Sequence, residues 1–188
     1  MDGKVIIFFA PSGAGKTSIV KHLLRYIPSL SFSVSATSRA PRNGEKHGTD
    51  YIFISPEEFR QYIDHGEFLE YEEVYKGCYY GTLKAQTEEL LKSGRNIVFD
   101  VDVKGACNIK NYYGERALSI FVMPPSVEEL HNRLIGRSTD SPEAVKSRIA
   151  KAEYELSFAD KADRILINDK LKKAQAEALQ LVENFIKQ

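Results

Sequence analysis

One segment near the amino terminus limits the folds open to this chain more than any other. Val5–Ala10 is an apolar run of β-branched and aromatic residues, which is typical of a buried strand. A short glycine-rich turn follows it, and the next stretch, Lys16–Tyr26, carries apolar residues at helical spacing. We therefore predict a strand, a tight turn and a helix in immediate succession, which is how a parallel α/β sheet is built.

The turn matches the phosphate-binding pattern G-x-x-x-x-G-K-[ST], with alanine in its first place. Its residues are Ala10, Pro11, Ser12, Gly13, Ala14, Gly15, Lys16 and Thr17. Backbone N–H groups converge on phosphate oxygens in such a loop, so glycine stands where a side chain would obstruct. The helix amino terminus adds positive potential. Lys16 supplies a positive charge for the β- and γ-phosphates, and Thr17 supplies a hydroxyl ligand for Mg²⁺. We predict nucleotide binding, while the loop alone leaves open ATP or GTP, and a kinase, an ATPase or a switch.

The rest of the chain alternates between strand and helix patterns. Further buried strands are predicted at Asn96–Val101, Leu118–Val122 and Arg164–Asn168, and helices at Leu83–Lys92, Lys104–Tyr112, Ser126–Ile135, Pro142–Phe158 and Leu171–Ile186. This alternation predicts an α/β fold with a doubly wound parallel sheet. Asp100 lies at the carboxyl end of a predicted strand, where a carboxylate can face Mg²⁺ and its waters.

Two regions interrupt the alternation. Residues 32–82 hold short, closely spaced strands, predicted at 32–35, 51–54, 68–75 and 78–81, with a small helix opened by the Ser55–Glu58 capping box. This pattern indicates a mostly β insertion. A second capping box, Ser126–Glu129, opens two helices after a Pro-Pro pair, and these helices are candidates for a lid rather than core.

Composition narrows the class of protein. The chain has 188 residues with 26 Lys and Arg against 26 Asp and Glu, which suggests one compact unit and disfavours a nucleic-acid coat protein. Its longest apolar run is too short to span a bilayer, and no charged-then-apolar leader precedes it. Cys78 and Cys107 form no C-x-x-C pair, which argues against a disulfide scaffold or a zinc module. We expect a cytoplasmic protein with no membrane and no nucleic-acid partner.

Polar and charged residues inside the β insertion suggest a second phosphorylated ligand. Arg39 and Arg42 are three apart in a loop, and arginine forks pair well with phosphate oxygens. Tyr51 follows on the next strand, Glu70 stands between apolar neighbours, and Tyr79–Thr82 adds hydroxyls and a glycine. Each feature is weak alone, because an arginine pair is usually a solvated surface. Together with a phosphate loop they indicate a phosphate-bearing acceptor.

These motifs resemble the guanylate kinases, which transfer a phosphoryl group from ATP to GMP or dGMP. The most specific match is SxTxRxPRxGExxGxDY, from Ser35 to Tyr51, and it continues through GEFLEY, YYGT, FDVDVKG, PPSVEEL, RLIGR and IND. Departures are mild: Ser38 stands where threonine is usual in the family, and Ser138 where glycine is usual. The resemblance covers nearly the whole chain and implies a single guanylate kinase-like domain active in purine nucleotide metabolism and GMP recycling.

The resemblance also implies a division of labour along the chain. The core would comprise residues 1–31, 83–125 and 160–188, with a GMP-binding insertion at 32–82 and a lid at 126–159. The GMP phosphate would be held by Ser35, Arg39, Arg42, Tyr51 and Tyr80, and the guanine would be read by Glu70 and Thr82 with Asp102 nearby. The transferring phosphoryl group would be covered by Arg133, Arg137 and Arg148, together with the catalytic Lys16 and Arg39. Asn168 would touch the adenine of ATP, and Mg²⁺ would be held by Thr17 and Asp100.

Elementary chemistry supports two of these roles. Guanine presents N1–H and N2–H₂ side by side, and one carboxylate such as Glu70 accepts both, whereas adenine offers a lone pair at N1. Arg133 and Arg137 are four apart and would share a helix face, which suits the charge that develops in phosphoryl transfer.

Two other readings stay open on the sequence. Guanylate-kinase-like domains of scaffold proteins resemble this fold but bind phosphorylated peptides without catalysis. A kinase of related fold would act on a phosphorylated sugar or another nucleotide. The joint presence of the phosphate loop, Asp100 and the lid arginines favours the enzyme over the first alternative, and Glu70 argues against the second.

Overall fold

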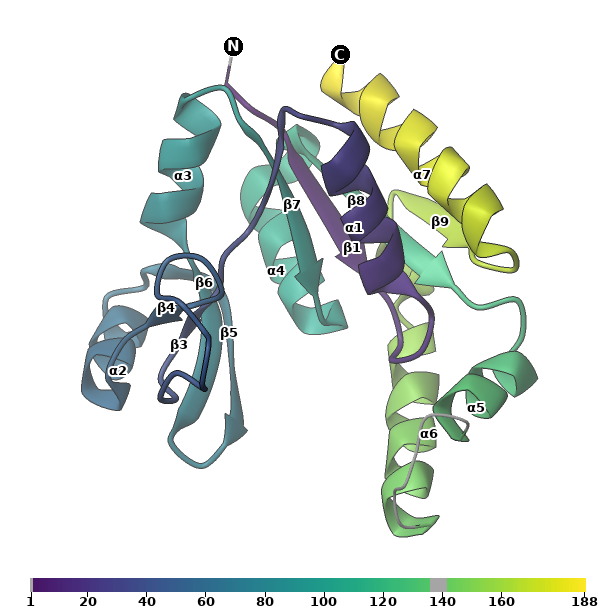
Figure 1. Ribbon diagram of the computed structural model, residues 1–188, viewed down its shortest axis with the longest axis horizontal. Coiled ribbons are helices and arrows are strands. Elements are labelled where there is room, and N and C mark those ends of the chain that lie inside the picture. The colour runs from purple at the N-terminus through teal and green to yellow at the C-terminus, as the bar shows by residue number, and fades with distance from the viewer. Residues whose placement is uncertain (1, 136–141) are drawn as a thin grey trace.

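A five-stranded parallel sheet forms the centre of the molecule (Figure 1). The computed structural model describes residues 2–135 and 142–188, apart from the side chains of residues 134, 135, 142–146 and 148. In spatial order the strands are β2 (Leu30–Phe32), β7 (Asn96–Val101), β1 (Val5–Phe9), β8 (Ala117–Met123) and β9 (Arg164–Ile167). The predicted α/β class with a doubly wound parallel sheet is confirmed.

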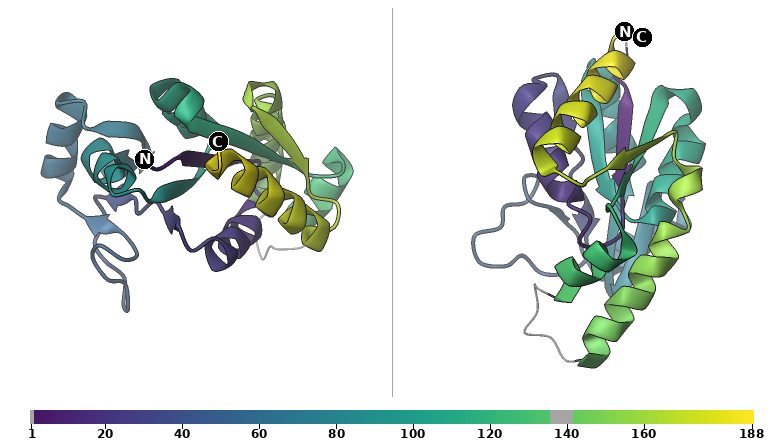
Figure 2. Two further views of the ribbon diagram at one scale, coloured as in Figure 1. Left: turned by 90° about the horizontal axis from the view of Figure 1, so that it is seen from above. Right: turned by 90° about the vertical axis from the view of Figure 1, so that its right-hand side faces the viewer.

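Helices cover both faces of this sheet, because alternate side chains of each buried strand point in opposite directions. Ile6 and Phe8 of β1 pack with α1 (Lys16–Tyr26) and α7 (Leu171–Ile186). Ile7 and Phe9 face the other way, toward α3 (Lys84–Lys92) and α4 (Val103–Tyr113). The left view of Figure 2 shows α1 and α7 on one side of the sheet and α4 on the other.

A smaller four-stranded sheet is formed by residues between α1 and α3. Its order is β4 (Ile52–Phe53), β3 (Ala36–Thr37), β6 (Cys78–Leu83) and β5 (Phe68–Tyr75). The helix α2 (Pro56–Asp64) covers it through Phe59, whose ring stacks on Phe68 at 4.3 Å and on Tyr79 at 5.2 Å between centroids. The predicted cap at Ser55 is confirmed, since its hydroxyl accepts the Glu58 N–H at 3.1 Å.

Two helices project from the opposite side of the core. They are α5 (Val127–Ile135) and α6 (Pro142–Leu156), and Leu130 and Ala152 form a small buried cluster between them. Short 3₁₀ turns, η1 (Gly114–Arg116) and η2 (Ala159–Lys161), precede β8 and β9. In Figure 1 the small sheet lies at the lower left and α5 and α6 at the lower right. Both therefore extend past the same edge of the central sheet, the edge at which its parallel strands end.

One predicted strand is wrong. The expected strand at 32–35 is replaced by β2, which ends at Phe32 and pairs with β7 in the central sheet, with Leu30 opposite Asn96. The last hydrogen bond to that sheet runs from the Ser33 N–H to the Val98 carbonyl at 3.0 Å. The chain then leaves the sheet, and β3 begins separately at Ala36. A three-residue edge strand has too little apolar sequence to be recognised by pattern.

Other boundaries differ by one or two residues from those predicted. The helix α4 starts at Val103 rather than Lys104 because the Asp102 carboxylate caps it, and β6 continues to Leu83, so α3 starts one residue later than expected. No helix within residues 2–135 and 142–188 combines the length and the apolar character that crossing a membrane requires.

Candidate active site

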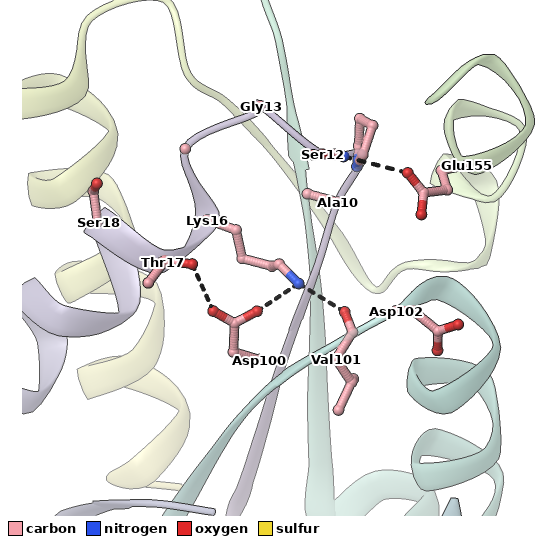
Figure 3. A pocket seen from close by; sticks show the side chains of 12 residues that line it. Ala10, Ser12, Gly13, Lys16, Thr17, Ser18, Asp100, Val101, Asp102 and Glu155 are labelled. Atoms are coloured by element: carbon pink, nitrogen blue, oxygen red, sulfur yellow. Dashed lines mark hydrogen bonds and ion pairs between the residues drawn. The ribbon is translucent and has the colours of Figure 1, made fainter. Parts of the chain in front are cut away.

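The phosphate loop lines a pocket at the carboxyl edge of the sheet. Residues 10–15 link β1 to α1, and all of them except Ala14 line a pocket of about 380 Å³ together with Lys16, Thr17, Asp100 and Glu155 (Figure 3). Gly15 has φ +92°, and a Cβ there would lie 2.3 Å from the Asn168 amide nitrogen. The loop conformation therefore requires glycine at this position both for backbone angle and for space.

Lys16, Thr17 and Asp100 converge in this pocket. The Lys16 Nζ lies 2.5 Å from one Asp100 carboxylate oxygen and donates to the Val101 carbonyl at 2.8 Å. The Thr17 hydroxyl donates to the other Asp100 oxygen at 3.0 Å. Parallel pairing of β1 with β7 places Phe8 opposite Asp100, which brings the carboxylate beside the loop. The structure thus brings together the residues predicted to bind phosphates and metal.

The donor set at Thr17 and Asp100 fits Mg²⁺ that arrives with a nucleotide. Hydroxyl and carboxylate oxygens are its preferred protein ligands, and Mg²⁺ usually takes only one or two of them, with phosphates and water completing the shell. Among the described residues, no group of three or more His, Cys, Asp or Glu side chains is placed to hold a metal ion by itself. A site completed by substrate phosphates is therefore the arrangement these residues suit.

Asn168 holds the phosphate loop by a side-chain hydrogen bond. It is 4% exposed, it follows β9, and its amide nitrogen donates to the Ala14 carbonyl at 2.7 Å. Its backbone N–H is bonded to the Met123 carbonyl at 2.8 Å, which fixes the chain after the last strand. This contact locks the loop to the sheet; a contact between Asn168 and adenine stays a prediction.

Three residues predicted for the GMP phosphate lie together on the small sheet. The Arg39 Nε donates to the Tyr80 hydroxyl at 2.9 Å, and the Arg39 guanidinium lies 5.0 Å from the centre of the Tyr51 ring. The Tyr51 and Tyr80 rings meet edge-on at 5.7 Å. Ser35 and Arg42 lie in the segments flanking β3, and Arg42 is exposed. The cluster presents a cation and two hydroxyls on one surface.

Glu45 belongs to this cluster and was missed by the sequence analysis. Its two carboxylate oxygens accept from the two terminal nitrogens of Arg39, both at 2.7 Å, and one of them also accepts the Arg42 N–H at 2.8 Å. The hydrogen bonds from Arg39 hold the pKa of Glu45 down to about 2. The only available signal was an acidic residue close to two arginines in the same loop.

A second pocket surrounds Glu70, which lies on β5. The Thr82 hydroxyl donates to one Glu70 oxygen at 2.6 Å, and Thr82 is 2% exposed. Burial raises the pKa of Glu70, and the charges of Asp102 and Glu72 act in the same direction, while the Thr82 hydrogen bond opposes them. The pocket measures about 310 Å³, and Asp102 and Gly105 also line it. The structure thus places Glu70, Thr82 and Asp102 in one site.

The two pockets adjoin each other at Asp102. This residue caps α4 by accepting the Gly105 N–H at 2.7 Å, and it lines both the phosphate-loop pocket and the Glu70 pocket. A smaller space of about 110 Å³ lies beside it, bounded by Glu72 of β5 and by Lys151 and Glu155 of α6. Ligands in the two pockets would therefore approach each other over the end of β7.

The predicted lid arginines are only partly described. The Arg133 Nε is paired with Glu129 one helical turn earlier at 2.9 Å, and its terminal nitrogens lie 3.5 Å from the Asn168 carbonyl. Arg137 lies outside the described residues, so the prediction that it shares a helix face with Arg133 stays a prediction. Arg148 lies within α6, and its side chain is outside what the structure describes.

Glu155 is a second residue that the sequence analysis missed. It is 5% exposed, it lies in the last turn of α6, and its carboxylate accepts the Ser12 N–H of the phosphate loop at 3.3 Å (Figure 3). One acidic residue among several in an amphipathic helix carries no signal of such a contact, because the two residues are far apart in sequence.

Comparison with known proteins gives the family. The guanylate kinase family model matches residues 2–187. A guanylate kinase of Bacteroides fragilis is 62% identical over 185 residues, which cover 98% of this chain and 91% of that protein. A guanylate kinase of Porphyromonas gingivalis is 51% identical over 97% of this chain and 98% of its own length.

A solved structure agrees with these relatives. The crystal structure of guanylate kinase from Anaplasma phagocytophilum matches with a TM-score of 0.74 at 28% identity, covering 100% of this chain and 88% of that one. The predicted resemblance is therefore confirmed, and the matches support the enzyme rather than the inactive binding module. The chain belongs to the guanylate kinase family, the ATP:GMP phosphotransferases.

Proposed function

We propose that this protein transfers the γ-phosphoryl group of ATP to GMP, and also to dGMP, for purine nucleotide metabolism and GMP recycling. The observation that carries this proposal is the meeting of two pockets at Asp102, one built from a phosphate loop and one from a buried carboxylate. A phosphate donor and a guanine-bearing acceptor bound there would have their phosphates facing each other.

On the donor side, ATP phosphates would lie in the loop pocket. Lys16 lines the pocket that the ATP phosphates would enter. It would therefore exchange its contact with Asp100 for one with the β- and γ-phosphates. Thr17 and Asp100 would hold Mg²⁺, which when bound offsets negative charge on the β- and γ-phosphates. Asn168, beneath the loop, would lie toward the adenine.

On the acceptor side, the GMP phosphate would sit at the Arg39 cluster. Arg39, Tyr51 and Tyr80 already share one surface, and Ser35 and Arg42 would complete the set from the flanking loop. The guanine would enter the other pocket, where Glu70 accepts N1–H and N2–H₂. Thr82 would hold the Glu70 carboxylate in place, with Asp102 alongside.

The transfer itself needs positioning and charge neutralisation rather than a base. An ionised oxygen of the GMP phosphate attacks the γ-phosphorus in line, and the bond from that phosphorus to the β–γ bridging oxygen breaks. The electron pair stays on that oxygen, so ADP leaves with the charge and GDP carries the new phosphoryl group. Lys16 and Arg39 would balance this charge, joined by Arg133, Arg137 and Arg148 when the lid closes.

The division into moving parts belongs to the same proposal. Residues 32–82 would form the GMP-binding insertion and residues 126–159 the lid, on a core of residues 1–31, 83–125 and 160–188. The small sheet and the α5–α6 pair extend from the same edge of the core on opposite sides, which supports closure of both over the substrates (Figure 1). Closure would exclude water and so protect ATP from hydrolysis.

A substrate panel tests the function. ADP formation is followed in a coupled assay with ATP, Mg²⁺ and GMP, dGMP, AMP, UMP or CMP in turn. We expect turnover with GMP and dGMP and little with the other three. Equal turnover with AMP would refute the guanine assignment of Glu70, and absence of turnover with GMP would refute the proposed function.

A further inference from the structure

The carboxylate of Glu155 accepts a hydrogen bond from a backbone N–H of the phosphate loop, a group that can bind nucleotide phosphate. Backbone N–H groups of such loops bind anions, and the Ser12 N–H instead donates to Glu155 at 3.3 Å. The two residues are 143 positions apart in sequence, so the contact exists only because α6 ends beside the loop. Figure 3 shows the Glu155 side chain directed from its helix toward Ser12.

The surroundings of Glu155 stabilise its contact with the phosphate loop. It is 5% exposed, and burial raises its pKa, while the Ser12 N–H, Lys151 and Lys16 favour the ionised form and Asp102 opposes it. Lys16 is itself held by Asp100 at 2.5 Å. The loop therefore meets carboxylates of its own chain at two of the points where it would meet phosphate.

Glu155 also lies at the end of α6 that adjoins the core, where a small rotation of the helix would displace its far end by several times as much. It is in the last turn of α6, next to the segment that returns to the core through η2 and β9. The 15 residues of α6 span about 22 Å at 1.5 Å per residue. Leu130 of α5 packs on Ala152 of α6, so we expect the two helices to move together.

We propose that Glu155 is a positioning residue that couples the phosphate loop to the lid: it holds Ser12 and the inner end of α6 together in the empty enzyme, and the phosphates of ATP displace it. The displacement frees the α5–α6 pair to close over the donor. This inference rests on the proposed function only in taking ATP as the ligand of the loop. The contact costs ATP affinity, because the phosphates must replace a bound anion and are repelled by it.

Calorimetric titration with ATP, without GMP, tests the sign of this effect. Glu155→Gln keeps the size of the side chain and removes its charge, so we expect ATP to bind about fivefold more tightly, a typical size for coupling between sites. Glu153→Gln is the matched control, because it removes a charge from the same helix at a side chain that is 57% exposed. We expect the control to change ATP affinity by less than about twofold.

Two further measurements separate coupling from simple support of the loop. In steady-state kinetics, Glu155→Gln should lower KM for ATP and leave KM for GMP unchanged. In the wild type, the Ser12 amide proton resonance should move when an ATP phosphate replaces the carboxylate as its acceptor. In the Glu155→Gln variant without ATP it should lie upfield of the wild-type position, because its acceptor is then neutral. Glu155→Met, which keeps the approximate length of the side chain without a charge or an oxygen acceptor, serves as a second variant if the first unfolds, and it should also bind ATP more tightly than the wild type.

The outcomes distinguish this inference from the function on which it rests. If the wild type fails to bind ATP, the proposed function fails. If the wild type binds ATP and Glu155→Gln binds it equally or more weakly, Glu155 only supports the loop and the inference is wrong. An unmoved Ser12 resonance on ATP binding would overturn it as well.

Discussion

Replacing Glu70 by glutamine should destroy guanine recognition by reversing a single hydrogen-bonding group. In the structure the Thr82 hydroxyl donates to one Glu70 oxygen at 2.6 Å, and Thr82 is buried. A glutamine at position 70 keeps that bond only by turning its carbonyl oxygen toward Thr82. Its NH₂ group then points into the pocket, where N1–H and N2–H₂ of guanine are also donors. As long as the Thr82 hydroxyl remains the donor, the amide adopts the orientation that is worst for GMP.

The size of the effect follows from the loss of charged acceptors in a buried site. Unpaired buried donors facing each other cost about 2–4 kcal/mol, which corresponds to a fall of roughly 30- to 1000-fold in kcat/KM for GMP. AMP should become a less poor substrate relative to GMP, because an amide can donate to its N1. KM for ATP should stay unchanged, since the loop pocket lies across Asp102 from Glu70.

The assay compares kcat/KM for GMP and AMP in the wild type, Glu70→Gln and Glu72→Gln. Glu72 lies on the same face of β5 and lines the same pocket, but Thr82 hydrogen-bonds to Glu70. If charge alone governed guanine binding, both variants would lose similar activity. A loss below about threefold in Glu70→Gln, under 1 kcal/mol, would refute the assignment of Glu70 as the guanine reader.

Four further predictions follow from the described contacts. Lys16→Ala should abolish nearly all turnover in a protein that stays folded by circular dichroism; an unchanged kcat would contradict the phosphate-loop assignment. Glu45→Gln should raise KM for GMP about threefold with little change in kcat, because Arg39 loses a charged partner that fixes it; equal KM values would show that Arg39 needs no such support. Burial raises the pKa of Glu70 in the folded state, so its stabilising contribution is present at low pH and is lost as pH rises through that pKa. Glu70→Gln should therefore raise the melting temperature more above that pKa than below it, and a uniform shift would argue against a buried ionised Glu70. Small-angle scattering should give a smaller radius of gyration with a bisubstrate analogue of ATP and GMP, and equal radii would count against closure.

The local sequence was sufficient to predict those parts of the structure that depend on consecutive residues. The phosphate loop could be placed because its pattern sets the backbone conformation of a few consecutive residues, and Gly15 adopts the positive φ that the pattern requires. Buried strands such as Asn96–Val101 and the helix at Leu171–Ile186 were predicted at their observed ends because their apolar periodicity is strong. The predicted roles of the site residues came from the family resemblance and stay predictions.

Contacts between distant segments could not be predicted in the same way. The edge strand β2 has three residues and is defined by pairing with β7, which no local pattern shows. Glu155 reaches Ser12 across 143 positions, and its helix carries other acidic residues with the same local appearance. Glu45 was nearer to its partner, but an acidic residue in a charged loop is most often solvated, so its bidentate pairing with Arg39 required the tertiary structure.

Carboxylates paired with the basic side chains determine the electrostatics of the site. Clustered basic side chains without partners would repel one another and favour an open site. Instead Lys16, Arg39 and Arg133 are each paired with a carboxylate, from Asp100, Glu45 and Glu129 respectively. Paired charges repel their neighbours weakly, so repulsion among these three cations contributes little to opening the site. At Lys16 the ATP phosphates compete with the Asp100 carboxylate already in place, so ATP affinity reflects the difference between the two anions rather than the full attraction of an unpaired lysine.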